Sequence, residues 1–286
     1  MKQKRRSVGF IIVVVILVVL YSNIVSSLKN SNQETVIIKP FKKTEAVYTA
    51  QLDKLLEDTF TSEQLKNVAV SLYSPSLNYS YDFNEKDNYL SASTIKVPVA
   101  LYIYDLSKKD SAILEQSITY LAADYEDGSG SIQFASYGSS YQVKTLLEKM
   151  IMESDNVAFN MLTRVYFENQ ANLEKELKPY FGKADYAHQK SNSQNKMKVL
   201  KYLYKNQTEY KTLMQDLKNN YSKERIPKYL DVEVANKVGT YENVYIDYGI
   251  VYHTKPYLIS ITFNNIGYSD EIMAKLAQEI DKIMII

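Results

Sequence analysis

The stretch S-A-S-T-I-K, residues 91–96, places Ser93 three residues before Lys96 at the predicted start of a helix. Three residues are about one helical turn, so both side chains lie on one face and the amine can contact the serine oxygen. A partly desolvated lysine has a lowered pKa and can remove the hydroxyl proton, as in a Ser-Lys pair. The N–H groups of a helix N-terminus favour the negative charge that then develops. The pattern is therefore compatible with a nucleophilic serine.

The same letters also fit a serine that simply begins a helix and is followed by a solvated lysine. S-x-x-K occurs twice more in the chain, at residues 26–29 and 193–196, so the motif alone does not decide. Two further motifs favour the chemical interpretation. The triplet S-D-N occurs once, at residues 154–156, and K-V-G-T at residues 237–240 opens a predicted strand.

The elements that would position these motifs follow from the spacing of apolar residues. Runs rich in β-branched and aromatic residues predict strands, at residues 68–73, 79–83, 233–240, 244–253 and 257–264. Apolar residues at helical spacing predict helices, at residues 46–59, 95–106, 143–152, 157–167, 196–204 and from about 270 to the end. Ser269 is the predicted N-cap of the last helix, since serine is a favoured capping residue.

Strands near both ends of the chain therefore flank a mostly helical middle. We predict an α+β fold in which a mixed sheet built from both termini lies beside an all-helical lobe. The seam between two such lobes is a natural cleft. A chain of 286 residues is long enough for this arrangement as one large domain or two closely packed ones.

The order S-x-x-K, S-D-N, K-x-G is the motif set of class A β-lactamases and penicillin-binding proteins. Over residues 46–286 the sequence resembles the class A β-lactamase-like serine hydrolase family. The resemblance implies a β-lactamase/transpeptidase-like fold with the site at the seam. It also implies that Ser93 is the acylated nucleophile and Lys96 its base partner. The implied substrates are β-lactams or D-Ala-D-Ala-type peptides from peptidoglycan.

The resemblance assigns roles to the other motif residues as well. Ser154 would pass a proton to the leaving nitrogen, and Asn156 would hold the substrate amide. Lys237 would set the electrostatics of the site and help to hold a substrate carboxylate. The backbone N–H groups of Ser93 and Thr240 would form an oxyanion hole, which typically contributes about 3 to 4 kcal/mol per donor.

Three positions beside these residues are also informative. Asp155 is expected to fix its loop by bonding backbone groups, and Gly239 would let the substrate lie close against the strand edge. At position 238 the family usually has Thr or Ser, whose hydroxyl binds the substrate carboxylate, whereas Val238 has none. Thr240 lies about 6 to 7 Å further along a strand and is no simple replacement.

The family's deacylating glutamate has no counterpart at the expected place. Residues 181–196 contain no glutamate and are too few for the family's loop. Glu168 and Asn172 spell E-x-x-x-N, but too early in the chain, while Asp185 and His188 fit a surface loop. General-base assistance is worth roughly 10²- to 10⁴-fold. We therefore predict acylation of Ser93 followed by slow hydrolysis of β-lactams.

The N-terminus carries a membrane-seeking segment. Four basic residues lie within positions 2–6, and the run from Val8 to Leu20 has no polar side chain. By the positive-inside rule we predict a single-pass anchor in the cell membrane over residues 1–27. A tether over residues 28–45 would then lead to an extracytoplasmic catalytic domain over residues 46–286. The length of the run leaves open whether the leader is cleaved.

Composition excludes several other classes of function. The 34 basic and 33 acidic side chains nearly cancel, which leaves no electrostatic footprint for nucleic acid. There is no cysteine, so disulfides and lipoprotein attachment are excluded, and a bacterial surface is favoured. The two histidines, His188 and His253, have no metal-ligand spacing. We expect no metal and no cofactor.

A non-catalytic cell-wall binding or scaffold protein is the alternative on the same fold. The presence of Ser93, Lys96, Ser154 and Lys237 favours the enzyme. A triad built on His253 is weaker, because that residue falls at the end of a predicted strand. The sequence does not identify the natural substrate, the acyl acceptor or the oligomeric state.

Overall fold

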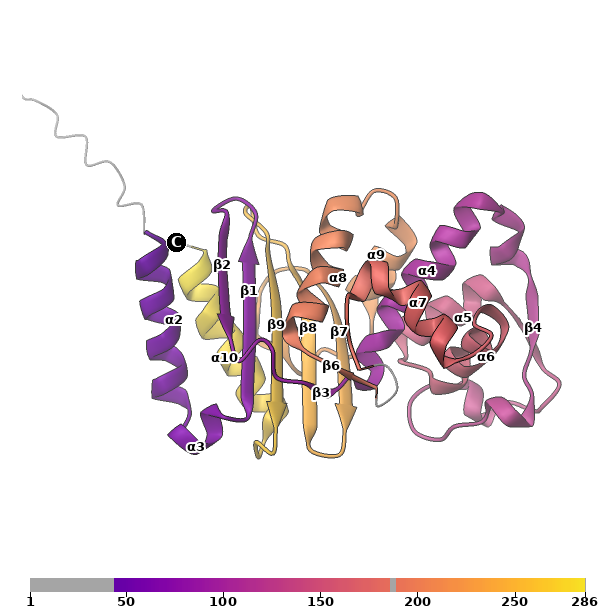
Figure 1. Cartoon of the computed structure of the whole chain (residues 1–286), viewed down its shortest axis with the longest axis horizontal. Coiled ribbons are helices and arrows are strands. Elements are labelled where there is room, and N and C mark those ends of the chain that lie inside the picture. Colours follow the sequence, from indigo (N-terminus) through magenta and orange to yellow (C-terminus); the bar gives the residue numbers. More distant parts are fainter. Residues whose placement is uncertain (1–43, 186–188, 286) are drawn as a thin grey trace, which may run out of the picture. The chain divides into compact units, whose positions relative to one another are not determined.

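The computed structural model describes residues 44–185 and 189–285, and within them strands from both ends of the chain meet in one five-stranded sheet (Figure 1). The strand order is β2-β1-β9-β8-β7. These strands are β1 (Val68–Ser74), β2 (Tyr79–Phe83), β7 (Val234–Tyr241), β8 (Val244–Val251) and β9 (Tyr257–Asn264). The prediction of a sheet assembled from both termini is confirmed.

The prediction of a mixed sheet was wrong, because every strand pairing in this sheet is antiparallel. Short turns join β1 to β2, β7 to β8 and β8 to β9, and a short turn reverses the chain direction. A parallel pair would need a crossover of about a dozen residues or more. The long connection through the lobe joins β2 to β7, which are the two edge strands, and β1 pairs with β9 in antiparallel orientation as well.

Two hydrophobic cores lie on opposite faces of the sheet, because side chains alternate along each strand. On β9, Ile261 and Phe263 belong to the core that packs against α2 (Glu45–Thr59) and α10 (Ser269–Met284). Leu258, which is out of step with them, belongs to the core of the helical lobe. One sheet therefore holds the terminal helices on one face and the lobe on the other.

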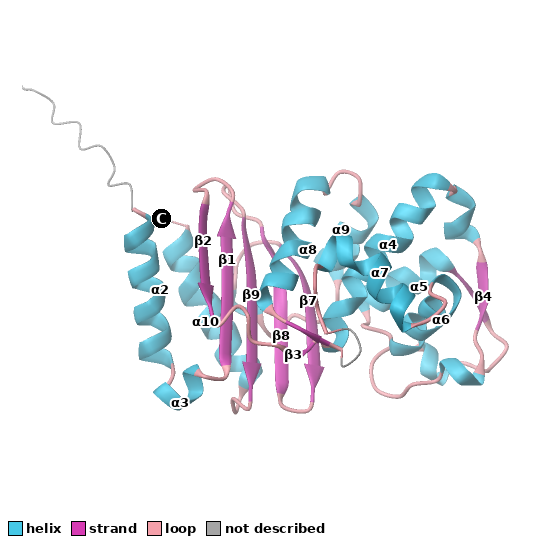
Figure 2. Cartoon of the chain, viewed as in Figure 1, coloured by secondary structure: helices cyan, strands magenta, loops and turns pink. Residues whose placement is uncertain are grey.

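The lobe follows the first hairpin in the chain and is mostly helical (Figure 2). Its helices are α4 (Lys96–Lys109), α5 (Val143–Met152), α6 (Asn156–Tyr166), α7 (Gln170–Phe181), α8 (Ser193–Asn206) and α9 (Lys211–Asn219). Shorter elements are α3 (Ser62–Leu65), β3 (Tyr89–Leu90), β4 (Ser117–Thr119), β5 (Ser140–Gln142), β6 (Lys190–Ser191) and the 3-10 turns η1 (Ala92–Ile95), η2 (Ser111–Glu115), η3 (Ala122–Asp124), η4 (Ile132–Phe134) and η5 (Ile226–Tyr229).

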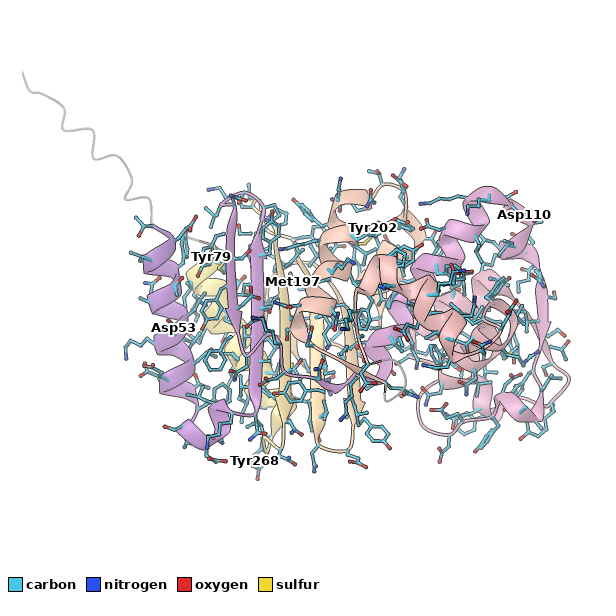
Figure 3. All side chains as sticks on the ribbon, viewed as in Figure 1. Asp53, Tyr79, Asp110, Met197, Tyr202 and Tyr268 are labelled. Carbon is cyan, nitrogen blue, oxygen red and sulfur yellow. The ribbon has the colours of Figure 1, made fainter. Side chains whose placement is uncertain are left out.

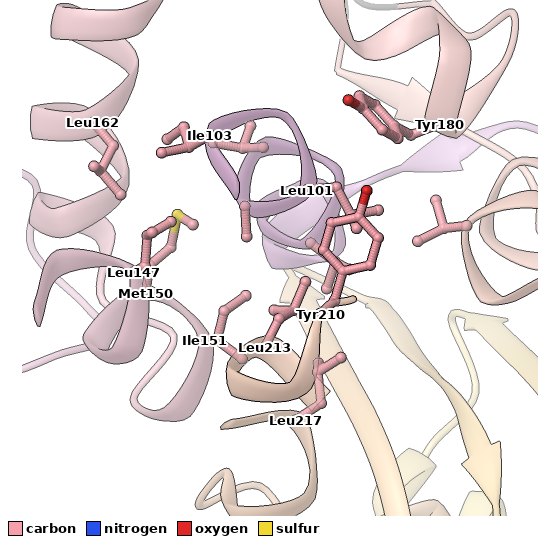
Figure 4. Packing of buried hydrophobic residues seen from close by; sticks show 14 of the residues in the cluster. Leu101, Ile103, Leu147, Met150, Ile151, Leu162, Tyr180, Tyr210, Leu213 and Leu217 are labelled. Atoms are coloured by element: carbon pink, nitrogen blue, oxygen red, sulfur yellow. The ribbon is translucent and has the colours of Figure 1, made fainter. Parts of the chain in front are cut away.

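Helix α4 lies at the centre of the lobe. Its residues Val99, Ala100, Leu101 and Ile103 have no exposed surface. Figure 4 shows Leu101 and Ile103 among apolar side chains of the neighbouring helices, which include Leu147, Met150, Ile151, Leu162, Leu213 and Leu217. Pro98 is the third residue of the helix, where its missing N–H group is not needed. Packing on all sides holds the first turn of α4 in place.

The start of the C-terminal helix differs from its prediction. Helix α10 includes Ser269 as its first residue, and its N-cap is Tyr268, whose backbone is left-handed at φ 55°. The hydroxyl of Ser269 donates backwards to the carbonyl of Ile266 instead of capping the helix. Tyr268, labelled in Figure 3, is 91% exposed. A tight turn between β9 and α10 thus displaces the cap by one residue.

The predicted membrane anchor and residues 28–43 of the predicted tether lie outside the described residues, and α2 begins at Glu45, the last residue of that tether. In the part of the chain that the structure describes, no helix is both long and apolar enough to cross a membrane.

Candidate active site

The turn that carries Ser93 is strained and firmly held. Ala92, just before Ser93, has a left-handed backbone at φ 44°, which is uncommon for a residue other than glycine. The carbonyl of Ser91 accepts hydrogen bonds from both the N–H and the hydroxyl of Thr94. The buried Tyr248 of β8 donates to the carbonyl of Thr94 at 3.0 Å. The surrounding packing therefore fixes the position of Ser93.

The edge strand β7 passes close to this turn. A Cβ atom at Gly239 would lie 3.0 Å from Thr94 Cγ2 and 3.1 Å from the carbonyl oxygen of Ser91. Any larger residue would push β7 away from η1. Gly239 thus allows the close approach of strand and turn that brings the backbones of Thr240 and Ser93 to the same seam.

Ser93 is half-buried, and among the described residues its Oγ makes no hydrogen bond. Its N–H group lies in the first turn of η1, where helix donors have no partner within the helix. The expected contact between Lys96 and the Ser93 oxygen is not formed in this structure. Ser93 lies within η1 and Lys96 begins α4, but the Lys96 amine turns to acceptors on the S-D-N loop instead.

Lys96 is 3% exposed and donates to three oxygens of that loop. Its Nζ donates to the carbonyl of Ser154, to Ser154 Oγ at 3.4 Å and to Asn156 Oδ1 at 2.7 Å. Burial lowers the pKa of Lys96 to about 7, against the opposing charges of Asp155 and Glu126. An amine with this pKa is neutral in a large fraction of molecules near pH 7 and can act as a base.

Ser154 bridges two buried amines. Its backbone is left-handed at φ 57°, and its Oγ accepts from Lys237 Nζ at 2.8 Å in addition to Lys96. Lys237 is 2% exposed, and burial followed by the charge of Lys96 lowers its pKa, whereas Asp247 opposes the shift. A hydroxyl between two such amines can pass a proton in either direction.

Asp155 fixes the loop as predicted. Its carboxylate is fully buried and accepts from Ala158 N at 2.8 Å and from Ile132 N at 2.9 Å. Gly130 lies directly against it, since a Cβ atom there would be 2.2 Å from Asp155 Cγ. Asp155 caps α6 and holds the neighbouring η4 turn against it.

Asn156 is the first residue of α6, and both ends of its amide are engaged. Its Nδ2 donates to the carbonyl of Asp127 at 3.0 Å, and its Oδ1 accepts from Lys96. These bonds hold the amide plane at the edge of the site. The structure therefore brings together Lys96, Ser154, Asn156 and Lys237 through direct hydrogen bonds.

On the other side of the seam, Thr240 is exposed and its hydroxyl accepts from Arg225 Nη2. Arg225 is 6% exposed, and its remaining nitrogens donate to the carbonyls of Gly239 and Ile246 and to Asp270 at 2.6 Å. Thr240 therefore presents a hydroxyl backed by a guanidinium group, whereas Val238 offers neither.

The sequence model described as the beta-lactamase enzyme family matches residues 49–284. The chain belongs to this family. The comparison with curated proteins found no match.

Solved structures of similar fold agree with the family. "Structure of PBP-A" superposes with a TM-score of 0.73 at 16% identity over 82% of this chain and 95% of that chain. A beta-lactamase from Sphaerobacter thermophilus gives 0.71 at 16% identity over 82% and 96% of the two chains. TLA-1 extended spectrum beta-lactamase gives 0.71 at 17% identity over 85% and 100%. The fold is thus the α+β fold of beta-lactamases.

Two buried residues near Lys237, Arg225 and Asp247, were not predicted as site residues from the sequence. Arg225 precedes the K-x-G strand, and Asp247 is fully buried beside it on β8. Asp247 accepts from Asn236 Nδ2 at 3.0 Å and from Ile226 N at 3.0 Å, and burial raises its pKa to about 6 while Arg225 and Lys237 oppose this. The sequence shows that these residues are an arginine and an aspartate, but it does not show that they are buried, so it gave no signal that they belong to the site.

The second S-x-x-K motif differs from the first in this beta-lactamase fold. Ser193 and Lys196 are both buried, with 1% and 0% of their surfaces exposed. Lys196 contacts Ser191 and Asn192 of its own neighbourhood and no part of the S-D-N loop. Substrate cannot reach this serine, so the motif is structural here. The third copy, at residues 26–29, lies outside the described residues.

The other residues weighed from the sequence make no hydrogen bond to Lys96, Ser154 or Lys237 among the described residues. His253 bonds Asp281 at 2.7 Å, and Asp185 pairs through its backbone with Lys190. Glu168 is exposed beyond the end of α6. His188 lies outside the described residues. Within residues 44–185 and 189–285, no group of three or more His, Cys, Asp and Glu side chains is placed to hold a metal ion.

Proposed function

We propose that this chain is a membrane-anchored, extracytoplasmic serine hydrolase that forms an acyl-enzyme on Ser93 with β-lactams or D-Ala-D-Ala-type peptides. The observation that carries the proposal is the hydrogen-bonded set of Lys96, Ser154 and Lys237 beside the strained turn of Ser93. A mutant of PBP-A, a structure of the same fold, is an acyl-enzyme complex with penicillin G, which supports the substrate class.

In the proposed acylation, neutral Lys96 takes the hydroxyl proton of Ser93 while Oγ attacks the substrate carbonyl carbon. The N–H groups of Ser93 and Thr240 stabilise the oxyanion of the tetrahedral intermediate. The proton then passes through Ser154 to the leaving nitrogen as its bond to the carbonyl carbon breaks. Lys237 orients Ser154 by donating to its Oγ at 2.8 Å.

In this proposal the hydroxyl that binds the substrate carboxylate lies at position 240 of β7 and not at position 238, where the family usually has it. Val238 has no hydroxyl, whereas Thr240 has one that is paired with the buried Arg225. A substrate carboxylate would therefore be held by Thr240, Arg225 and the field of Lys237. The displacement along the strand favours D-Ala-D-Ala-type peptides, whose carboxylate can adjust its position, over the rigid ring system of a penicillin.

Hydrolysis of the acyl-enzyme is expected to be slow. Residues 182–192, which connect α7 to α8, contain no glutamate that could activate water. Asp155 cannot serve instead, because both of its oxygens accept backbone N–H groups. Without a well-placed base, deacylation loses part of the roughly 10²- to 10⁴-fold assistance that such a group gives.

The anchor is proposed from the sequence. The apolar run from Val8 to Leu20 follows basic residues, which favours a cytoplasmic N-terminus and a domain outside the cell membrane. Membrane fractionation, followed by protease treatment of intact cells, tests this part. A catalytic domain that stays protected from protease on intact cells would contradict it.

Intact-mass spectrometry of the full-length protein with penicillin G, followed over hours, tests the enzymatic proposal. We expect a covalent adduct that persists and that is absent in Ser93→Ala. Ser193→Ala, in the buried second motif, is the matched control and should keep the adduct. Rapid regeneration of free enzyme would refute slow turnover. No adduct with either penicillin G or a D-Ala-D-Ala peptide would favour the non-catalytic cell-wall binding protein.

A further inference from the structure

A short segment before the S-D-N loop is clamped onto α6 by two asparagines. Asn156 Nδ2 donates to the carbonyl of Asp127 at 3.0 Å. Asn160 Nδ2 donates to Glu126 Oε2 at 2.9 Å and to the carbonyl of Asp124 at 3.3 Å. Side chains four residues apart on a helix are neighbours, with Cβ atoms about 5 to 6 Å apart. The Glu126 carboxylate is thus held one helical turn from the amide of Asn156.

The side-chain amide of Asn156 also binds the amine of Lys96, the proposed base for acylation. Lys96 Nζ lies 2.7 Å from Asn156 Oδ1, so Lys96 and Glu126 are bound to adjacent asparagines on one face of α6. Lys96 and Glu126 form no direct ion pair, so a proton that moves between them needs a bridging water. Glu126 nevertheless acts electrostatically on Lys96, since its charge opposes the lowering of the pKa of that amine.

The asparagine that holds Glu126 also borders a cavity. A cavity of about 440 Å³ is lined by Asn160, by Phe159 and by Ile95, the residue just before Lys96. This volume is within the usual range for small-molecule sites. Asp155, the other carboxylate whose charge acts on Lys96, is fully buried and engaged with backbone donors. Glu126 and its neighbour Asp127 are both exposed, and of the two Glu126 is the one whose carboxylate is held by Asn160 and whose charge acts on Lys96.

We propose that Glu126 is the general base that activates water for hydrolysis of the Ser93 acyl-enzyme. This inference rests on the function proposed above. Glu126 takes one proton from water as the water oxygen bonds to the ester carbonyl carbon. The tetrahedral intermediate then breaks its bond to Ser93 Oγ, which receives that proton by way of Lys96 Nζ. The products are a free carboxylic acid and the regenerated serine.

This assignment explains how turnover can occur although residues 182–192 supply no base. Glu126 approaches from the segment before the S-D-N loop and depends on Asn160 for its position. Its carboxylate is exposed, so solvent competes for it and its advantage should be at the lower end of the roughly 10²- to 10⁴-fold range for general bases.

Glu126→Gln in the full-length protein tests the proposal. The amide keeps an oxygen that can accept from Asn160 but cannot take up a proton. We expect the adduct with penicillin G to form within about two-fold of the wild-type rate and to persist ~10²-fold longer. Glu57→Gln is the matched control, because Glu57 is an exposed glutamate on α2, which packs on the face of the sheet away from the helical lobe. Its adduct lifetime should equal that of the wild type.

Each other outcome has a definite meaning. An unchanged adduct lifetime in Glu126→Gln, with normal adduct formation, would refute the role of Glu126 and leave the acyl-enzyme function standing. An adduct that forms much more slowly in this variant would place Glu126 in acylation and overturn its assignment to deacylation. No adduct in the wild type would refute the acyl-enzyme function and this inference with it. Circular dichroism of both variants excludes misfolding.

Discussion

Lys196, the lysine of the second S-x-x-K motif, is a buried charge without a carboxylate partner among the described residues. Its side chain has no exposed surface, and Nζ donates to Ser191 Oγ at 3.1 Å and to the carbonyl of Asn192 at 3.3 Å. Burial alone lowers its pKa from 10.5 to about 7. Near neutral pH the folded protein must therefore either hold an unpaired buried ammonium or lose a proton.

We predict that Lys196→Met stabilises the protein in mildly acidic solution. The difference between 10.5 and 7 is 3.5 pKa units, and at about 1.4 kcal/mol per unit the protonated lysine costs the folded state about 5 kcal/mol. The substitution also removes two hydrogen bonds, each worth about 1 kcal/mol. The expected net increase in the free energy of unfolding is ~3 kcal/mol at about pH 6.

The sign of the pH dependence follows from proton binding. Between the folded pKa of about 7 and the unfolded value of 10.5, the unfolded chain holds a proton on Lys196 that the folded protein lacks. Wild-type stability therefore rises with pH across this interval. The advantage of Lys196→Met should shrink by ~4 kcal/mol between about pH 6 and about pH 10, where its lost hydrogen bonds leave it slightly less stable.

Urea unfolding followed by circular dichroism at both pH values measures this difference. Lys198→Met, on the exposed side of the same helix, is the matched control and should change the free energy of unfolding by less than about 0.5 kcal/mol at either pH. A Lys196→Met variant that is destabilised equally at both pH values would refute the reasoning. It would show that the hydrogen bonds of the amine outweigh its desolvation.

Three further predictions concern the proposed site. The rate of adduct formation on Ser93 should rise with pH up to about 7 and then level off, because Lys96 must be neutral to accept a proton; stopped-flow acylation that is flat across this range would contradict this. Gly130→Ala should destabilise the protein by more than ~3 kcal/mol, since its Cβ would overlap Asp155, whereas Gly138→Ala, also at positive φ but with nothing within 4 Å, should cost only about 1 kcal/mol. Thermal unfolding compares the two, and equal losses would refute the clash. Val238→Thr should accelerate acylation by penicillin G ~10-fold by adding a hydroxyl for its carboxylate, and an unchanged rate would show that no carboxylate is bound there.

Local periodicity was enough to predict most elements of this fold. The predicted bounds of the strand at residues 257–264 and the helix at residues 143–152 coincide with β9 and α5. Apolar spacing is a property of a few consecutive residues, and each side chain faces the core or the solvent according to that spacing. For the same reason the sequence placed strands at both ends and helices between them.

Features that depend on how one helix or strand packs or connects to another could not be predicted from local periodicity. The direction of each strand relative to its neighbours is set by the connections and the register, so the sheet was predicted as mixed but is antiparallel. The cap of α10 depends on the turn from β9, which made Tyr268 the cap in place of Ser269. Spacing along the chain contains neither piece of information.

By itself the sequence determined which residue types are present and their order: a serine and lysine before a helix, S-D-N, and K-x-G on a strand. Only the tertiary structure decided that Lys96 meets Ser154, 58 residues away, and that Lys237 meets the same hydroxyl across 83 residues. It also decided the different surroundings of Lys96 and Lys196. Burial lowers the pKa of both lysines to about 7, yet only Lys96 faces the S-D-N loop. Desolvation and pairing arise where distant elements pack together, and the spacing of residues within one element cannot specify them.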